Sequence, residues 1–465
     1  MLLKNLIYIL QSENYYLGRF LKFAYSHPIW WRLEQRQKIT WTHKVKLIYF
    51  LSWVLIILAF SLVRQLEGSF FLISKNFFIS LLVLILIILS LPLIISLSFL
   101  IISPLDSLFK KIIIKKARNI LKNLDIIKIG ITGSFGKTST KEILATILSQ
   151  EFKVIKTPDN INTDIGIAIF IMENQEKIKE SEVFVIEMGA YQQGEIRSTA
   201  EMINPEYSLL TGINECHLER FGSLENIINT KLELANITKK LTIVNNDNAN
   251  ISQINFKNTQ SKGDFLKISQ KLAQNIKILD NFSGLNFEFQ NTQFYTKLLA
   301  RHNIVLILMC IKIAIELGID LEKIKKGVAE IKYIPHRLEP IYNPNTKVMV
   351  IDDSYNGNFA GIKSGLEILA QSQGRKIVLT QGLVELGDEA ARIHNDIGEL
   401  YAGQVDLALL IKNSVCDYIV EGLKSRGFTN YKIYKNTEEA HKDLVNVLQK
   451  NDTIIFQNDW TDNYN

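Results

Sequence analysis

Cysteine, proline and glycine are all scarce in this sequence. Its 465 residues include 3 cysteines, 8 prolines and 24 glycines, whereas 47% of the residues are hydrophobic. Cys216, Cys310 and Cys416 lie far apart, so they form neither a disulfide framework nor a metal-binding ribbon, and they fit a reducing compartment. A chain so rich in apolar residues and so poor in glycine and proline is not disordered.

Acidic residues are scarce in the first quarter of the chain. Residues 1–122 contain 16 Lys or Arg and only 4 Asp or Glu, a net charge of +12. The whole chain carries +6, so residues 123–465 carry −6. This distribution excludes a nucleic-acid-binding main body, because affinity for phosphate backbones is built from clustered Lys and Arg. The basic excess lies beside apolar runs, which suits a membrane surface better.

Two runs without charge have the length of membrane helices, residues 47–63 and 77–105. A helix needs about 20 residues to cross a bilayer, so the second run is expected to tilt, to kink at Pro92 or to end within the run. The first run starts too late for a cleaved signal peptide. The alternative is a pair of buried core helices, although uncharged runs of this length are rare in soluble cores.

The charges beside these runs predict their orientation. Lys and Arg residues precede the first run and follow the second, whereas the short connection between them contains few charges. The positive-inside rule therefore places both ends of the chain in the cytoplasm, as a multi-pass protein of the cell (inner) membrane. Residues 1–34 fit either an interfacial helix or an ordinary cytoplasmic leader.

From residue 125 onward, short apolar runs alternate with helix-like segments. This rhythm predicts parallel α/β sheets with functional loops at the carboxyl ends of the strands. Three units are expected: a membrane anchor with two transmembrane helices (1–122), a central nucleotide-binding domain with a parallel sheet (123–334) and a C-terminal Rossmann-like α/β domain (335–465). Residues 256–297 are polar and alternating and look like a small β insertion.

The sharpest local motif is GITGSFGKTS, residues 130–139, which follows an apolar strand and opens a helix. Glycines let the backbone aim N–H groups at phosphate, and the helix N-terminus adds partial positive charge. Lys137 can reach the β and γ oxygens of a nucleotide, and the Thr138 hydroxyl can bind Mg²⁺. The alternative is a tight turn with a chance Gly-Lys-Thr. The residues expected to hold phosphate are Gly133, Ser134, Gly136, Lys137, Thr138 and Ser139.

TGSFGKTST resembles the phosphate loop of the Mur ligases, the ATP-dependent amide-forming enzymes of peptidoglycan synthesis. The resemblance continues in order through DNINTDIG, EMGAYQQGEI, TGINECHLERFGSLENIINTK, RHN, HRL and DDSYNGN, and it covers residues 125–465. Within the family the chain looks most like the branch that adds D-alanyl-D-alanine. The resemblance implies a central P-loop domain, a C-terminal Rossmann-like domain, and ATP with two Mg²⁺ ions as cofactors.

Several roles follow from that resemblance. Glu187 would hold Mg²⁺ as Walker-B acids do, the alternative being a solvated carboxylate at a strand end. His217 would bind a second metal, although a lone histidine is more often structural. Lys231 would be carbamylated by CO₂ into an anion that bridges metals, which requires a lowered pKa, and a plain exposed lysine is the alternative. Lys137, His217, Lys231 and Arg337 are thus the expected catalytic residues.

The remaining implied contacts involve the nucleotide and the acceptor. Asn303 opens a helix and would contact the nucleotide, or simply cap that helix. Arg337 would reach the phosphates when the C-terminal domain closes about a hinge at residues 333–336. Asp353 and Asn356 would meet the nucleotide or the incoming amine. The residues expected to meet the muramyl end of the acceptor are Asn160, Asn162 and Thr163.

The expected reaction is phosphorylation of a carboxylate by ATP, followed by attack of an amine on the acyl phosphate. The expected partners are a cell-wall precursor, nucleotide- or lipid-linked, D-alanyl-D-alanine or another amine, and the membrane, but no nucleic acid. Two features depart from the family pattern: the membrane hairpin stands where a uridine-nucleotide domain usually lies, and the chain ends in IIFQNDWTDNYN. A poly-γ-glutamate-type ligase and a membrane-tethered nucleotide switch remain alternatives.

Overall fold

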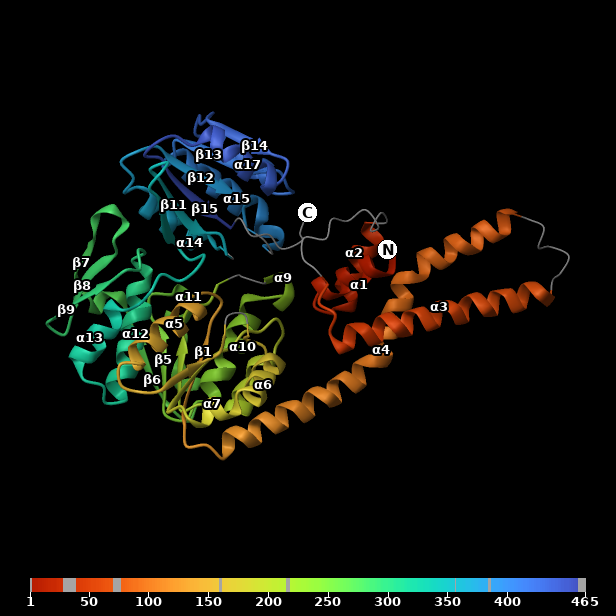
Figure 1. Cartoon of the computed structure of the whole chain (residues 1–465), viewed down its shortest axis with the longest axis horizontal. Coiled ribbons are helices and arrows are strands. Elements are labelled where there is room, and N and C mark those ends of the chain that lie inside the picture. The colour runs from red at the N-terminus through yellow and green to blue at the C-terminus, as the bar shows by residue number, and fades with distance from the viewer. Residues whose placement is uncertain are drawn as a thin grey trace. The chain divides into compact units, whose positions relative to one another are not determined.

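The structure, a computed structural model, describes seven stretches of the chain: residues 2–27, 39–69, 77–158, 161–214, 218–355, 357–383 and 386–458. The chain divides into two compact units, Met1–Ile112 and Ile113–Asn465 (Figure 1). Each unit has its own core, and they are described separately below.

The first unit is helical. Its elements are two short helices, α1 (Leu2–Ser12) and α2 (Leu17–Ser26), the long helix α3 (His43–Ser69), and the greater part of α4 (Phe77–Lys122), which continues into the second unit. Within the described residues, two segments are long and apolar enough to cross a membrane, His43–Leu62 and Ile85–Lys122. Helix α4 continues through Pro92 and Pro104, so it neither ends inside the predicted run nor stops at residue 105.

Helix α1 is buried within the first unit. Leu6, Ile7 and Leu10 on α1 pack against apolar residues of the other three helices, among them Ile48 and Ile95. Buried hydroxyls join the two long helices as well, because Ser52 of α3 donates a hydrogen bond of 2.9 Å to Ser98 of α4. Hydroxyl pairs of this kind are a common means of holding apolar helices together.

The second unit begins with a parallel six-stranded sheet, in the order β2-β3-β1-β4-β5-β6. Its strands are β1 (Ile127–Thr132), β2 (Val154–Lys156), β3 (Val183–Glu187), β4 (Tyr207–Leu210), β5 (Leu241–Asn245) and β6 (Asp264–Ile268). The helices of this part are α5 (Lys137–Leu148), α6 (Asp164–Glu173), α7 (Gln175–Lys179), α8 (Glu195–Ile203), α9 (Leu218–Phe221), α10 (Leu224–Ile237), α11 (Ala249–Ser252), α12 (His302–Glu316) and α13 (Leu321–Ala329).

Both faces of this sheet are covered, which explains its nearly continuous apolar strands. Val183 and Val185 face a core that includes residues of α5, α12 and α13. Phe184 and Ile186 point to the opposite face, where residues of α6, α8 and α10 form a second core. The end of α4 joins that second core through Ala117 and Leu121.

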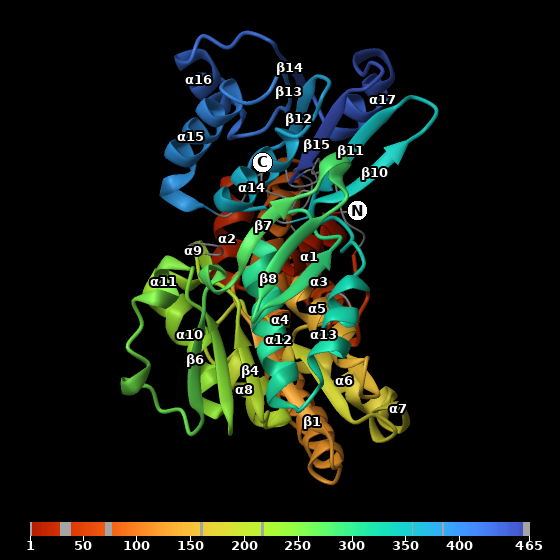
Figure 2. The ribbon, with the colours of Figure 1, turned by 90° about the vertical axis from the view of Figure 1, so that its left-hand side faces the viewer.

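A separate three-stranded antiparallel sheet follows, in the order β7-β8-β9. Its strands are β7 (Gln274–Ile278), β8 (Leu285–Phe289) and β9 (Thr292–Thr296), and they lie beside α12 and α13 (Figure 2). The predicted β insertion over residues 256–297 therefore begins too early in the sequence, because the separate sheet starts only at β7. Strand β6 belongs to the central sheet, because it pairs with β5 in parallel.

The C-terminal part contains a second six-stranded sheet, in the order β10-β11-β15-β12-β13-β14. Its strands are β10 (Glu339–Asn343), β11 (Val348–Asp353), β12 (Lys376–Thr380), β13 (Leu407–Ile411), β14 (Tyr431–Tyr434) and β15 (Thr453–Gln457). Its helices are α14 (Phe359–Leu369), α15 (Ala390–Ala402), α16 (Cys416–Ser425) and α17 (Thr437–Val447). Strand β10 is antiparallel to β11, so the sheet is mixed, while its other pairs are parallel as predicted.

The order of the central strands predicts a ligand site at the carboxyl end of β1. Strand β1 lies between β3 and β4, although both follow it in the chain after a crossover. Open parallel sheets bind ligands where neighbouring connections leave a strand in opposite directions. The register places Ile131 opposite Glu187, so that Glu187 ends its strand next to the start of the glycine loop.

Candidate active site

The glycine loop after β1 folds closely against the loop after β4. The Ser134 backbone N–H donates to the Gly212 carbonyl at 2.7 Å. A Cβ added at Gly133 would lie 2.2 Å from the Thr211 hydroxyl oxygen, which is too short for any real contact. Gly136, the residue before α5, has φ +76° and caps the helix without a side-chain hydrogen bond. Glycine is therefore required at residue 133 by the close approach and favoured at 136 by the backbone.

Lys137, the first residue of α5, folds back over this loop. Its Nζ donates to the carbonyl of Gly133 at 2.9 Å and lies 3.5 Å from the carbonyl of Ser134. A cation beside the helix N-terminus makes the loop strongly attractive to an anion. Leu306 of α12 lies against Gly136, because a Cβ there would be 3.4 Å from Leu306 Cδ1. The start of α12 is thus brought close to the loop.

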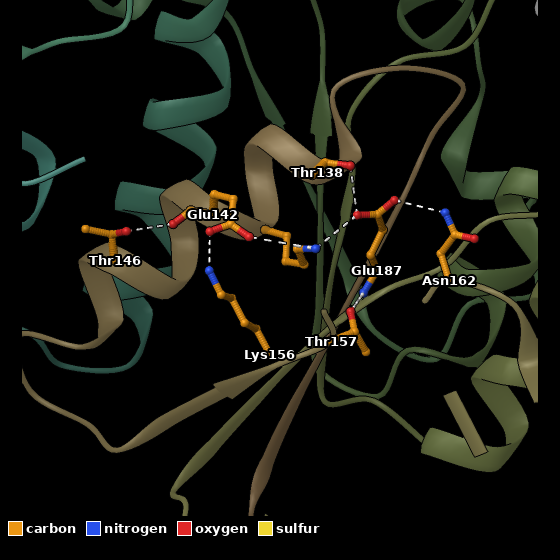
Figure 3. A network of polar contacts seen from close by, with 8 residues as sticks. Thr138, Glu142, Thr146, Lys156, Thr157, Asn162 and Glu187 are labelled. Atoms are coloured by element: carbon orange, nitrogen blue, oxygen red, sulfur yellow. Dashed lines mark hydrogen bonds and ion pairs between the residues drawn. The ribbon is translucent and has the colours of Figure 1, made fainter. Parts of the chain in front are cut away.

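Glu187 is buried, with 4% of its surface exposed. The alternative of a solvated carboxylate at a strand end is therefore wrong. The Thr138 hydroxyl donates to Glu187 Oε2 at 2.9 Å, and Asn162 Nδ2 donates to Oε1 at 3.1 Å (Figure 3). A carboxylate and a hydroxyl together are hard oxygen donors of the kind that Mg²⁺ prefers, so this pair fits a magnesium ion beside a phosphate.

The three residues predicted to contact the acceptor, Asn160, Asn162 and Thr163, differ in what the structure shows of them. Asn160 lies outside the described residues. Asn162 donates a hydrogen bond to Glu187, so it connects its own loop to the candidate metal site. The Thr163 hydroxyl accepts a hydrogen bond of 3.3 Å from the Gly166 N–H and caps helix α6.

Lys231 lies on α10 and is 4% exposed, so the alternative of a plain exposed helix lysine is wrong. Its Nζ lies 5.9 Å from the centre of the Phe221 ring. Carbamylation of Lys231 stays a prediction. His217, the predicted second metal ligand, lies outside the described residues. Among the residues that the structure describes, no group of three or more His, Cys, Asp or Glu is placed to hold a metal ion.

Asn303 is buried in the first turn of α12. Arg301 occupies the cap position of that helix, so the alternative that Asn303 caps it is wrong. The neighbouring His302 Nδ1 lies 3.1 Å from the hydroxyl of Ser364 on α14, so this turn also contacts the C-terminal domain.

Arg337 lies in the short connection between α13 and β10. Its guanidinium donates to the Tyr355 carbonyl and lies 4.8 Å from the centre of the Tyr355 ring. His336 and Leu338 on either side have φ values of 60° and 52°, a conformation that is uncommon for residues other than glycine. The backbone is therefore held in a specific shape around Arg337, near the hinge predicted at residues 333–336.

Asp353 ends β11 and faces Arg337. Burial raises the pKa of Asp353 to about 7, and the positive charge of Arg337 opposes that shift. Its backbone carbonyl accepts a hydrogen bond of 3.1 Å from the Asn458 N–H, which joins the ends of β11 and β15. Asn356, predicted to act beside it, lies outside the described residues.

Lys141 was missed by the sequence analysis. It lies on α5, has no exposed surface, and its Nζ is 3.5 Å from Glu187 Oε2. Helical periodicity is the signal that could have found it. Leu144 and Leu148, at i+3 and i+7, are fully buried, so Lys141 lies on the side of the helix that faces the core.

Comparison with known proteins matches both parts of the second unit. Residues 131–314 match the Mur ligase middle domain, and residues 336–457 match the Mur ligase, glutamate ligase domain. In solved structures, MurF from Acinetobacter baumannii has a TM-score of 0.65 at 24% identity, covering 75% of this chain and 77% of that one. MurF from Thermotoga maritima in complex with ADP has a TM-score of 0.63 at 23% identity, covering 75% and 80%. These likenesses confirm the predicted α/β fold.

Curated relatives are more similar in sequence. The UDP-N-acetylmuramoyl-tripeptide--D-alanyl-D-alanine ligase of Buchnera aphidicola (strain APS) is 31% identical over 70% of this chain and 72% of its own length. The Escherichia coli enzyme of the same name is 31% identical over 58% of this chain, and the match spans 61% of that relative. On this similarity, and on the two domain matches, the chain belongs to the Mur ligase family.

Proposed function

We propose that this protein is an ATP-dependent amide ligase of peptidoglycan precursor synthesis, which adds D-alanyl-D-alanine to a muramyl tripeptide. The observation that carries the proposal is the meeting of the glycine loop, Lys137 and the Thr138–Glu187 pair at the carboxyl edge of the central sheet. The relatives that share these domains are named for this reaction.

A carboxylate does not react with an amine at neutral pH, so it must first be activated. ATP supplies the phosphoryl group that turns the carboxylate of the tripeptide into an acyl phosphate. The amine then attacks the carbonyl carbon, the C–O bond to phosphate breaks, and inorganic phosphate and a proton leave. The protein supplies positioning and charge neutralisation, which are the main sources of catalysis in phosphoryl transfer.

The phosphate loop and α5 would bind the nucleotide. The backbone N–H groups of residues 133–136 and the start of α5 would face the phosphates, and Lys137 would exchange its loop carbonyls for phosphate oxygens. Thr138 and Glu187 would hold Mg²⁺. Asn303, Asp353 and Asn356 would contact the nucleotide or the amine, and Asn160, Asn162 and Thr163 would meet the acceptor.

Lys231 and His217 would form the second metal site. The buried Lys231 would react with CO₂ at Nζ and release a proton, which leaves an anionic carbamate. The carbamate would then position the metal-bound phosphate. Arg337 would neutralise charge on the transferred group from the C-terminal side, about the hinge at residues 333–336.

We further propose that α3 and α4 anchor the protein in the cell membrane as a multi-pass hairpin. Their apolar surfaces are broadly exposed, as at Phe50, Leu58 and Leu100, which a soluble protein would bury. The ligase domains would then lie in the cytoplasm, where the lysines after the second run are expected. A lipid-linked acceptor is the finer form of this proposal, because it would place the substrate at the same surface.

The test is a ligation assay with the full-length protein in detergent. ATP and either UDP-linked or lipid-linked muramyl tripeptide are supplied with D-alanyl-D-alanine or glutamate as the amine. Mass spectrometry follows the amide product, and ADP release is measured. Amide product with either acceptor supports the proposal and identifies the acceptor class. Product only with glutamate as the amine would favour a poly-γ-glutamate-type ligase. ATP turnover with no amide product from any amine would favour a nucleotide switch.

A further inference from the structure

A fully buried lysine lies beside the candidate metal carboxylate. Lys141 follows Lys137 by one turn of α5, and its Nζ lies 3.5 Å from Glu187 Oε2 and 3.7 Å from Glu142 Oε1. Removing an ammonium group from water costs several kcal/mol unless opposite charges offset the loss. The two carboxylates provide those charges, so Lys141 is held between them.

The two carboxylates differ in their surroundings. The Glu142 side chain is 25% exposed, and it forms a second ion pair with Lys156, whose side chain is 40% exposed (Figure 3). The Glu187 side chain is only 5% exposed. Water and Lys156 therefore compensate Glu142, whereas Glu187 depends much more on the charge of Lys141.

Glu187 is fixed in direction by contacts from several elements. Its backbone N–H donates to the Thr157 hydroxyl at 3.1 Å, and Asn162 donates to Oε1. Thr138 and Lys141, one turn apart on α5, both approach Oε2 (Figure 3 shows the Thr138 contact). Lys141 thus couples the orientation of the Glu187 carboxylate to α5, the helix that follows the phosphate loop.

We propose that Lys141 is a positioning residue for the magnesium–nucleotide site, acting through Glu187. Its buried charge keeps the Glu187 carboxylate directed toward the place where the metal and the phosphates meet. Lys141 would act through Glu187, because an ammonium group cannot serve as a metal ligand. This inference rests on the proposed function, because it requires Glu187 to serve a metal that accompanies ATP.

The test measures ADP binding, with and without Mg²⁺, to the full-length protein in detergent. In Lys141→Met, whose side chain fills similar space without charge, ADP affinity with Mg²⁺ should fall about 10- to 100-fold, as when groups behind a metal ligand are removed, while metal-free ADP affinity changes less than about 2-fold. Lys141→Arg keeps the charge and should recover part of the metal-dependent affinity. If Lys141→Met gives too little folded protein, Lys141→Gln replaces it with the same expectation.

Lys128→Met is the matched control. Lys128 lies on β1, is 8% exposed and pairs with Glu206 at 3.8 Å, so it is another buried lysine with a carboxylate partner. Its loss should lower thermal stability without changing the metal dependence of ADP binding. The same Mg²⁺ dependence in wild type and Lys141→Met would overturn the inference and leave Lys141 a purely structural residue. Wild-type binding that ignores Mg²⁺ would instead overturn the proposed metal site, and this inference with it.

Discussion

The central sheet and the C-terminal sheet are both six-stranded and largely parallel, but their carboxyl ends differ in chemistry. Strand β1 leads into glycines and the cation Lys137, whereas β11 ends in Asp352 and Asp353, and amide side chains follow β12 and β15 as Gln381 and Asn458. The first edge attracts phosphate, and the second offers carboxylates and amides. The difference teaches that the residues after the strands, rather than the sheet, distinguish the two domains chemically and would assign each its part of the proposed reaction.

The phosphate edge is tested most severely by removing its cation. Lys137→Ala should lower the rate of ligation by about 1,000-fold, since electrostatic groups at a transition state contribute on that scale. Membrane insertion should stay intact, so that the loss is measured on protein in its normal place. The measurement is product formation at saturating ATP. Ligation by this variant at near wild-type rate would show that the phosphate loop has been misassigned.

Replacing Lys231 tests whether the central domain needs the proposed carbamate as an anion in addition to Glu187. Lys231→Ala should reduce ligation about 100-fold, as expected for loss of a group that orients a metal. Added bicarbonate should raise wild-type activity in CO₂-depleted buffer and leave the variant unchanged. A bicarbonate response that persists in Lys231→Ala would place the carbamate elsewhere.

Arg337 tests whether the C-terminal edge contributes a charge to the same ATP. Arg337→Ala should lower ligation roughly 10-fold and weaken ligand-induced closure, because one charge-assisted contact to phosphate is lost. Closure is measured as the distance between labels on the two α/β domains, with and without ATP and acceptor. An unchanged distance in wild type, with ligation still occurring, would show that the domains already hold their working arrangement.

The smallest expected effect concerns the carboxylate edge and pH. The pKa of Asp353 is raised from 3.8 to about 7, so the folded protein keeps this proton where the unfolded chain has released it. The contribution of protonated Asp353 to the free energy of unfolding is therefore complete below pH 4 and is lost as the pH rises toward 7. Asparagine cannot ionise, so Asp353→Asn should remove this loss. The stability of the variant minus that of wild type should therefore be larger at pH 8 than at pH 4.5, by on the order of 1 kcal/mol after solvent screening.

Thermal unfolding of the ligand-free protein at the two pH values measures this difference. Because both proteins carry the same other carboxylates, only the change in their difference with pH reports on Asp353. A difference that stays constant with pH would mean that Asp353 is ionised in both states.

Much of the architecture follows from local sequence. The apolar runs around residues 183–187 and 376–380 form strands whose side chains pack into a core on each face of their sheet. The long uncharged runs become α3 and α4. The glycine loop was predicted because its backbone requirements and its lysine lie within ten consecutive residues. Signals of this kind need no knowledge of what lies across the sheet.

Only the tertiary structure decided the relations between distant residues. Helical periodicity could place Lys141 on the buried side of α5, but its pairing with Glu187 depends on β3 lying next to β1. The same holds for β6, which joins the central sheet, and for β10, which runs antiparallel at an edge. Strand order is set by the packing of the whole domain, and burial of a charge is tolerated only when that packing supplies its partner. The sequence determined the elements and the phosphate loop, while the fold decided which charges stand together.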